Sequence, residues 1–123
     1  MNLNSKRPVM LLVLLFVVLL SATAISAGAN ATPRRINVTA HRFAYEPSEI
    51  TLKKGEPVII VLHSTDVTHG LKIPDLGVLS EVKKGHDAEI ALTPTAVGHF
   101  QGKCAHFCGK GHGSMIFEVN VVE

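Results

Sequence analysis

Residues 104–115 read Cys104-Ala-His-Phe-Cys108-Gly-Lys-Gly-His112-Gly-Ser-Met115. The two cysteines of this segment are the only cysteines in the chain of 123 residues. A histidine and a methionine follow them at short spacing, and thiolate, imidazole and thioether together form a donor set that copper prefers over hard cations. Three alternating glycines allow the backbone to turn tightly and to approach a bound group closely. The segment therefore predicts one metal-binding loop that the rest of the chain supports.

Short apolar stretches, separated by turn residues, run from Thr32 to the end of the chain. Several alternate apolar and polar residues, which is the period of a half-buried strand, and residues 58–62 are continuously apolar, as in a strand buried on both faces. No segment carries a helical period. The pattern predicts an all-β sandwich or barrel. The expected strands are residues 36–40 (with Phe43 and Tyr45 continuing the alternation), 50–52, 58–62, 71–73, 88–92, 98–102 and 116–122.

The N-terminus has the pattern of an export segment. Lys6 and Arg7 precede an unbroken apolar run of twelve residues, and small and polar residues follow it. A run of this length favours a cleaved signal peptide over a membrane span, which needs about 20 apolar residues. The alternative, a single membrane anchor through residues 8–25, stays open. We expect residues 1–31 to be this segment and residues 32–123 to be one domain, exported to the periplasm or to the outer face of the cytoplasmic membrane.

The charge of the expected domain is balanced. Lys6 and Arg7 lie in the leader, which leaves ten Lys and Arg against ten Asp and Glu from Thr32 onward. Proteins that bind nucleic acid normally present a basic face, so the composition argues against a nucleic-acid partner.

A further metal donor is expected from outside the loop. His69 follows the continuously apolar strand, and a sandwich can bring two inter-strand loops together at one end. A mononuclear blue-copper site needs one cysteine, two histidines and a weak methionine, so the second cysteine would be surplus. Two bridging thiolates could instead hold two copper ions, each with one histidine. Met115 would then bind one ion weakly, and a backbone carbonyl would bind the other.

The motif Cys-x-x-x-Cys-x-x-x-His-x-x-Met, with Asp-Val-x-His upstream, resembles the binuclear CuA domain of cytochrome c oxidase subunit II. The resemblance covers residues 36–122 and implies a cupredoxin fold, a Greek-key β-sandwich or barrel. It implies that Cys104 and Cys108 provide bridging thiolates and that His69 and His112 provide the two imidazole ligands. It also implies that Met115 is a weak axial thioether ligand and that the backbone carbonyl of His106 is the remaining ligand.

The resemblance also implies an activity and partners. The activity is one-electron transfer from a c-type cytochrome or a similar redox donor to the catalytic subunit of a haem–copper oxidase. The chain would then be the electron-entry subunit of such an oxidase, or its partner, and not a self-contained catalyst. No His-x-His pair, as in the trinuclear centre of multicopper oxidases, and no hydrolytic triad stands out in the sequence.

Three features depart from the common form of that family. His106 stands where many oxidase subunits have a glutamate that binds a metal at the contact with the catalytic subunit. At most one membrane helix precedes the domain, as in the single-helix or free-standing forms. The chain has no tryptophan, which reduces the aromatic patch used for cytochrome docking and leaves Phe43, Tyr45 and Phe107 as substitutes.

Other interpretations of the same residues remain. Two cysteines in an exported protein often form a disulfide, and a zinc site would use Cys and His but not thioether. Met115 taken alone would be a core residue. The alternative function is an exported copper-delivery protein with a cupredoxin fold. We expect the remaining histidines (His41, His63, His86 and His99) to be structural or at the surface, and Phe43 and Phe100 to lie in the core.

Overall fold

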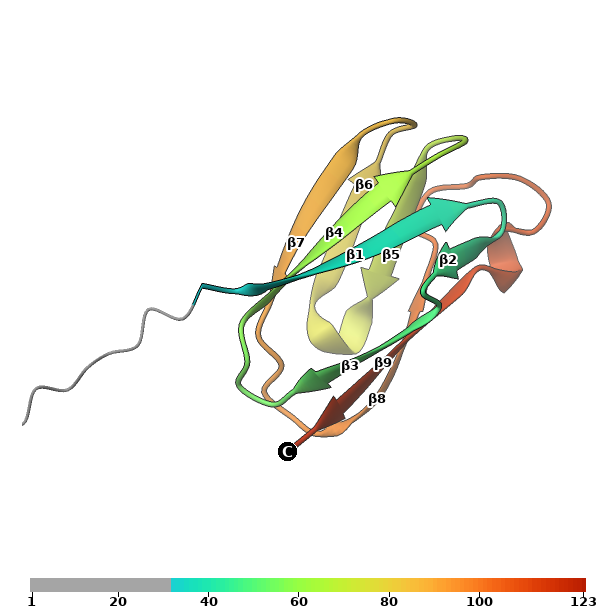
Figure 1. Cartoon of the computed structure of the whole chain (residues 1–123). Coiled ribbons are helices and arrows are strands. Elements are labelled where there is room, and N and C mark those ends of the chain that lie inside the picture. The colour runs from blue at the N-terminus through green and yellow to red at the C-terminus, as the bar shows by residue number, and fades with distance from the viewer. Residues whose placement is uncertain (1–31) are drawn as a thin grey trace, which may run out of the picture. The chain divides into compact units, whose positions relative to one another are not determined.

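The computed structural model describes residues 32–123, which form two β-sheets and two short 3-10 helices (Figure 1). The predicted export segment, residues 1–31, lies outside the described residues. Within residues 32–123, no helix is both long and apolar enough to cross a membrane. The strands are β1 (Arg34–His41), β2 (Ala44–Glu46), β3 (Glu49–Lys53), β4 (Val58–Ser64), β5 (His69–Ile73), β6 (Val78–Val82), β7 (Asp87–Leu92), β8 (Gly98–Lys103) and β9 (Ile116–Val122), and the 3-10 helices are η1 (Pro74–Leu76) and η2 (His112–Ser114).

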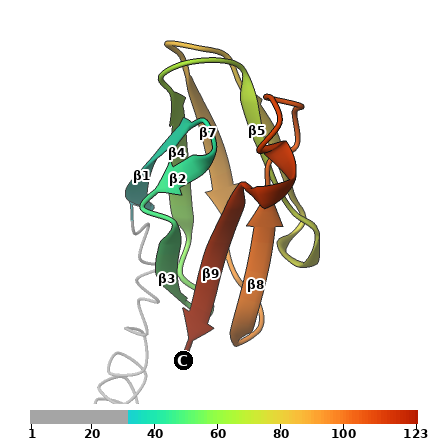
Figure 2. The ribbon, with the colours of Figure 1, turned by 90° about the vertical axis from the view of Figure 1, so that its right-hand side faces the viewer.

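The strands divide between a four-stranded sheet, ordered β2-β1-β4-β7, and a five-stranded sheet, ordered β3-β9-β8-β5-β6. β1 pairs with β4 and β3 pairs with β9 in parallel, while the other pairs are antiparallel. The chain changes sheet five times, between β2 and β3, β3 and β4, β4 and β5, β6 and β7, and β7 and β8, as in a Greek-key sandwich. Figure 2 shows β8 and β9 side by side below the loop that joins them. The predicted all-β, cupredoxin-like fold is confirmed.

The core lies between the two sheets because alternate residues of each strand point inward. β9 buries Phe117, Val119 and Val121, while β4 in the opposite sheet buries Ile60 and Leu62. Each such side chain contributes about 1.5–3 kcal/mol of burial free energy. The prediction that residues 58–62 form a strand buried on both faces is confirmed, since every residue of this run except the half-buried Ile59 is buried.

Two strands were not expected from the sequence. The alternation that seemed to continue from residues 36–40 through Phe43 and Tyr45 is broken by a turn, after which β2 pairs back on β1 with His41 opposite Ala44. β6 was not predicted either, because Pro74 and a 3-10 turn separate it from β5. Its residues Val78 and Val82 are nevertheless buried. Both strands follow tight reversals, which short-range apolar periodicity does not reveal.

Two expectations for aromatic residues are corrected. Phe43 is not a core residue, because the turn after β1 leaves its side chain 36% exposed. Tyr45 cannot serve a docking patch, because only 1% of it is exposed and its ring packs edge-on against Phe117 at 5.5 Å between centroids. Phe107, in contrast, is 74% exposed, and Phe100 is partly buried against the core.

Three connections meet at one end of the sandwich. They are the turn between β1 and β2, the turn between β4 and β5, and the loop between β8 and β9, which is orange-red in Figure 1. Hydrogen bonds join all three, since Arg42 of the first turn bonds to Asp66 of the second and to Cys108 of the third. The fold therefore gathers the sequence-predicted metal donors in one place.

Candidate metal centre

The loop between β8 and β9 is closed at its base and folded inward. The backbone N–H of Cys104 donates to the carbonyl of Met115 at 3.2 Å, and the N–H of His112 donates to the carbonyl of Gly109 at 3.1 Å. The 3-10 helix η2 then carries the chain to Met115. As a result, both cysteines and Met115 are buried, although they lie on a surface loop.

The two thiols lie beside each other, and each has an imidazole as neighbour. The Sγ atoms of Cys104 and Cys108 are 3.8 Å apart and form no disulfide. The Nδ1 atom of His69 lies 3.9 Å from the Cys104 sulfur, and the Nδ1 atom of His112 lies 3.7 Å from the Cys108 sulfur. Among residues 32–123, one group of His, Cys, Asp or Glu donors lies within 4.8 Å of one another, namely His69, Cys104 and Cys108. His112 is outside this group, so the two imidazoles do not converge on one point.

Two weaker donors complete the set. The thioether sulfur of Met115 lies 3.9 Å from the Cys108 sulfur, and the carbonyl oxygen of His106 lies 3.1 Å from the Cys104 sulfur. All six donors predicted from the sequence are therefore brought together. Soft thiolate and thioether with imidazole fit copper better than the hard cations, which prefer carboxylate and carbonyl oxygen.

Asp66 fixes the orientation of His69. Its Oδ1 atom lies 2.7 Å from Nε2 of His69, which is fully buried. Burial opposes ionisation of this carboxyl, but hydrogen bonds from the Arg42 N–H, from His69 and from the Val67 N–H prevail and lower its pKa to about 2. The ionised carboxylate accepts the proton of Nε2, which leaves the lone pair of Nδ1 directed at the Cys104 sulfur, as in the carboxylate–histidine–metal arrangement.

The strand that begins with His69 is held tightly under the loop. The hydroxyl of buried Tyr45 donates to the carbonyl of Gly70 at 2.5 Å. A Cβ atom at Gly70 would lie 2.8 Å from Cβ of Ala105 and 2.9 Å from the carbonyl oxygen of Ser80. Only glycine allows β5 to pass this close to the loop, so residue 70 sets the distance between His69 and the cysteines.

Burial also affects the thiol of Cys108. Burial and, to a smaller extent, the neighbouring Cys104 together raise the pKa of Cys108 to about 11, although Arg42 acts to lower it. At neutral pH the metal-free thiol is therefore protonated. A metal ion that binds there must displace the proton, so its affinity will increase with pH.

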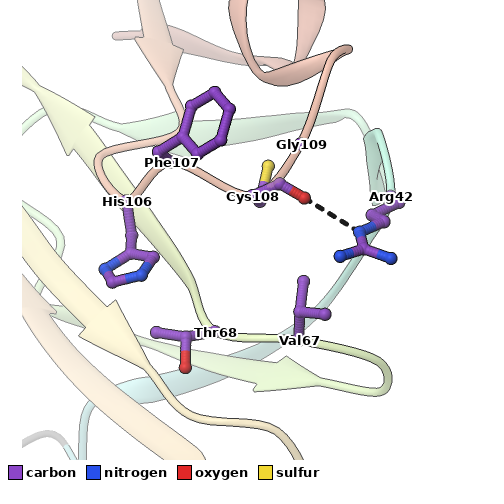
Figure 3. Close-up of a pocket in the computed structure, with 7 residues that line it drawn as sticks. All are labelled: Arg42, Val67, Thr68, His106, Phe107, Cys108 and Gly109. Atoms are coloured by element: carbon purple, nitrogen blue, oxygen red, sulfur yellow. Dashed lines mark hydrogen bonds between the residues drawn. The ribbon is translucent and has the colours of Figure 1, made fainter.

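An open pocket of about 320 Å³ adjoins Cys108 (Figure 3). Arg42, Phe107 and His106 line it, together with Val67, Thr68, Cys108 and Gly109. Nε of Arg42 donates to the carbonyl of Cys108 at 2.8 Å, the dashed line in Figure 3. The imidazole of His106 bonds to Glu81 at 2.8 Å, so its ring is held away from the sulfurs while its carbonyl faces one of them.

Sequence reasoning missed the roles of Arg42 and Tyr45. An arginine at the end of a strand carries no motif, and the alternation suggested nothing about the hydroxyl of Tyr45. Asp66 could have been found, because it stands three residues before His69 and a carboxylate commonly orients a metal-binding histidine.

The comparisons with known proteins agree with this geometry. The model of the Cupredoxin-like domain family matches residues 9–117. Cytochrome c oxidase subunit 2 of Alkalihalophilus pseudofirmus is 30% identical over 132 residues, which cover 94% of this chain and 39% of that protein. Subunit 2 of Thermus thermophilus is 28% identical over 88 residues, covering 72% of this chain and 65% of that protein. The chain thus spans less than two thirds of both relatives.

Solved structures show the same architecture. The periplasmic domain of subunit II of the cytochrome oxidase of Bradyrhizobium japonicum superposes with a TM-score of 0.67 at 20% identity, covering 73% of this chain and 84% of that domain. At this identity the similarity establishes the fold. Because the family model matches residues 9–117, which are most of the chain, the chain belongs to the cupredoxin-like domain family.

Proposed function

We propose that this chain is an electron-transfer protein with a binuclear copper centre of the CuA type. The observation that carries the proposal is the pair of buried thiols, 3.8 Å apart, with one imidazole Nδ1 beside each sulfur. The proposed ligands are the thiolates of Cys104 and Cys108, the imidazoles of His69 and His112, the thioether of Met115 and the carbonyl of His106.

The separation of the two imidazoles favours two ions over one. A single ion would draw both histidines to one point, but His112 lies outside the group that His69 forms with the cysteines. Thiolate sulfur can bridge metals, so the two cysteines could serve both ions. The thioether near Cys108 and the carbonyl near Cys104 would then supply one weak ligand at each end.

The residues of the chain would hold the donors in place during electron transfer. When bound, the copper pair would supply a centre that accepts and releases one electron. The donors sit on a closed loop and a buried strand, and both cysteines are buried. A site held this rigidly needs little rearrangement when its charge changes, which favours electron transfer over chemistry on a substrate.

The relatives suggest the partners and the location. Two are named as subunit 2 of cytochrome c oxidase and one solved structure as its periplasmic domain. We extend this to residues 32–123 as the copper domain of an exported protein, with residues 1–31 as signal peptide or single anchor. The proposed electron donor is a c-type cytochrome or similar carrier, and the proposed acceptor is a haem–copper oxidase.

Copper content and colour test the proposal. The full chain, reduced and then loaded with copper, should retain two copper ions and show intense visible absorption from the thiolates. Cys108→Ser removes one bridge and should lose both properties, whereas Ser114→Ala on the exposed part of the same loop should keep them. One cuprous ion per wild-type chain, bound without colour, would contradict electron transfer and favour copper delivery.

A further inference from the structure

Arg42 connects two chain segments that are far apart in the sequence. It stands in the turn between β1 and β2, and its Nε atom donates to the carbonyl of Cys108 at 2.8 Å, across 66 residues of chain (Figure 3). This carbonyl belongs to one of the proposed bridging residues. A charged donor makes a hydrogen bond stronger than one between neutral groups.

The backbone of the same residue reaches the other half of the site. The N–H of Arg42 donates to Oδ2 of Asp66 at 2.7 Å, and Oδ1 of Asp66 lies 2.7 Å from Nε2 of His69. One residue therefore joins the loop that carries Cys108 to the carboxylate that orients His69. Its side chain serves one connection and its main chain serves the other.

Phe43, the next residue, covers the loop beyond Cys108. A Cβ atom at Gly111 would lie 2.4 Å from the Phe43 ring, and one at Gly109 would lie 3.0 Å from it. The turn between β1 and β2 thus contacts the loop both at Cys108 and at the two glycines before His112. This packing places the Arg42 side chain against the loop.

The other arginines of the described chain behave differently. Arg34 and Arg35 form surface ion pairs with Glu56 and Glu89. Within residues 32–123, Arg42 is in no ion pair with a carboxylate side chain, and its recorded side-chain bond is to the main chain of the loop. Its guanidinium is thus used for positioning the backbone at Cys108.

We propose that Arg42 is a positioning residue that locks the loop between β8 and β9 in the arrangement the metal requires. This inference rests on the proposed copper site for its purpose, but the lock itself exists in the metal-free protein. It acts through the Cys108 carbonyl and through Asp66, and it contacts no metal.

The reactivity of the thiols tests the lock without copper. The reduced, metal-free full chain is mixed with an aromatic disulfide reagent, and the rate of thiol reaction is followed for wild type, Arg42→Met and Arg42→Lys. Arg42→Met keeps the length and loses the donor, so the buried thiols should react about tenfold faster, the effect of losing one charged hydrogen bond. Arg42→Lys keeps one N–H donor group, so its thiols should react at a rate between those of wild type and Arg42→Met. Arg35→Met, on the preceding strand, should match wild type.

Arg42→Lys separates the lock from a loss of charge. It keeps the positive charge but cannot reproduce the planar guanidinium bond to the Cys108 carbonyl. A faster reaction in Arg42→Lys than in wild type therefore reports exposure of the loop. An unchanged midpoint of thermal unfolding of Arg42→Met would show that the loop opens locally.

Copper-loaded samples give the second measurement. Arg42→Met should lose copper to a cuprous chelator faster than wild type and show an altered thiolate absorption band, with partial recovery in Arg42→Lys. Thiol reaction and copper loss at wild-type rates in Arg42→Met would overturn the proposal. If wild type itself shows no binuclear centre but Arg42→Met still exposes the thiols, the proposed function fails and the positioning role stands.

Discussion

Two of the candidate donor residues, His69 and Cys108, are each held by a hydrogen bond that does not use the donor atom itself. His69 is held through Nε2 by Asp66, and Cys108 is held through its carbonyl by Arg42. Met115 is completely buried, so packing fixes its thioether. At the scale of the residue, the site is therefore arranged before a metal arrives, which reduces the rearrangement that binding requires.

Met115→Leu should separate the two roles of this residue. Leucine has a similar volume, so the metal-free protein should lose less than about 1.5 kcal/mol of stability. Copper should remain bound by the thiolates and imidazoles, while loss of the weak axial thioether should shift the reduction potential. A redox titration measures this shift. A potential equal to that of wild type would exclude Met115 as a ligand.

Tyr45→Phe should weaken the support beneath His69. The variant leaves the carbonyl of Gly70 without its hydroxyl donor in a buried environment, which costs about 1–3 kcal/mol. Urea unfolding of the metal-free chain measures the loss. Ser114→Ala is the matched control, because the hydroxyl of Ser114 bonds to the carbonyl of Gly111 in an exposed setting and its removal should cost less. Equal losses in both variants would contradict this account.

At the scale of the element, the sequence predicted seven of the nine strands in the described residues. Residues 58–62 and 116–122 were clear because their apolar patterns are long enough to be distinctive. β2 and β6 were missed because tight turns isolate short strands whose partners are set by tertiary pairing. The motif spacing and the family resemblance together predicted the candidate donors, but they could not predict the turn that contacts the loop, because Arg42 and Phe43 act through contacts distant in sequence.

Gly111→Ala tests how closely the turn between β1 and β2 packs on the metal loop. The new Cβ atom would meet the Phe43 ring at 2.4 Å, so either the ring or the loop must move, at a cost of about 1–3 kcal/mol. Gly113→Ala in the same loop is the control, since its Cβ would have no neighbour within 4 Å. The midpoint of thermal unfolding and the amount of copper retained should both fall in Gly111→Ala and should stay at the wild-type values in Gly113→Ala. Unchanged values for Gly111→Ala would show that the turn is mobile.

At the scale of the molecule, the candidate metal donors lie together at the end of the sandwich where the three connections meet. The strands of the two sheets carry ion pairs, such as His63 with Asp87 and His99 with Glu118. The ten basic and ten acidic residues from Thr32 onward leave no charge excess on the domain. Recognition of a partner would then depend on local features near the loop, such as exposed Phe107.

The stability of the whole fold should depend on pH through His99. A side-chain bond to Asn120, with Glu118 and Glu49 nearby, raises the pKa of His99 above its usual value near 6.5. A raised pKa in the folded state means that protonation stabilises the fold. This contribution is complete below about pH 6.5 and is lost as the pH rises through the raised pKa. Urea unfolding of wild type and His99→Gln across this range measures the difference. Parallel pH profiles for the two proteins would contradict the assignment.

Paramagnetic resonance of the copper-loaded full chain tests the central claim most directly. The account predicts a hyperfine pattern from one unpaired electron shared equally by two copper nuclei, because in the proposed centre both thiolates would bind both ions and each ion would have its own imidazole. A pattern from a single copper nucleus, or a silent cuprous protein that cannot be oxidised without losing its metal, would contradict the binuclear electron-transfer centre.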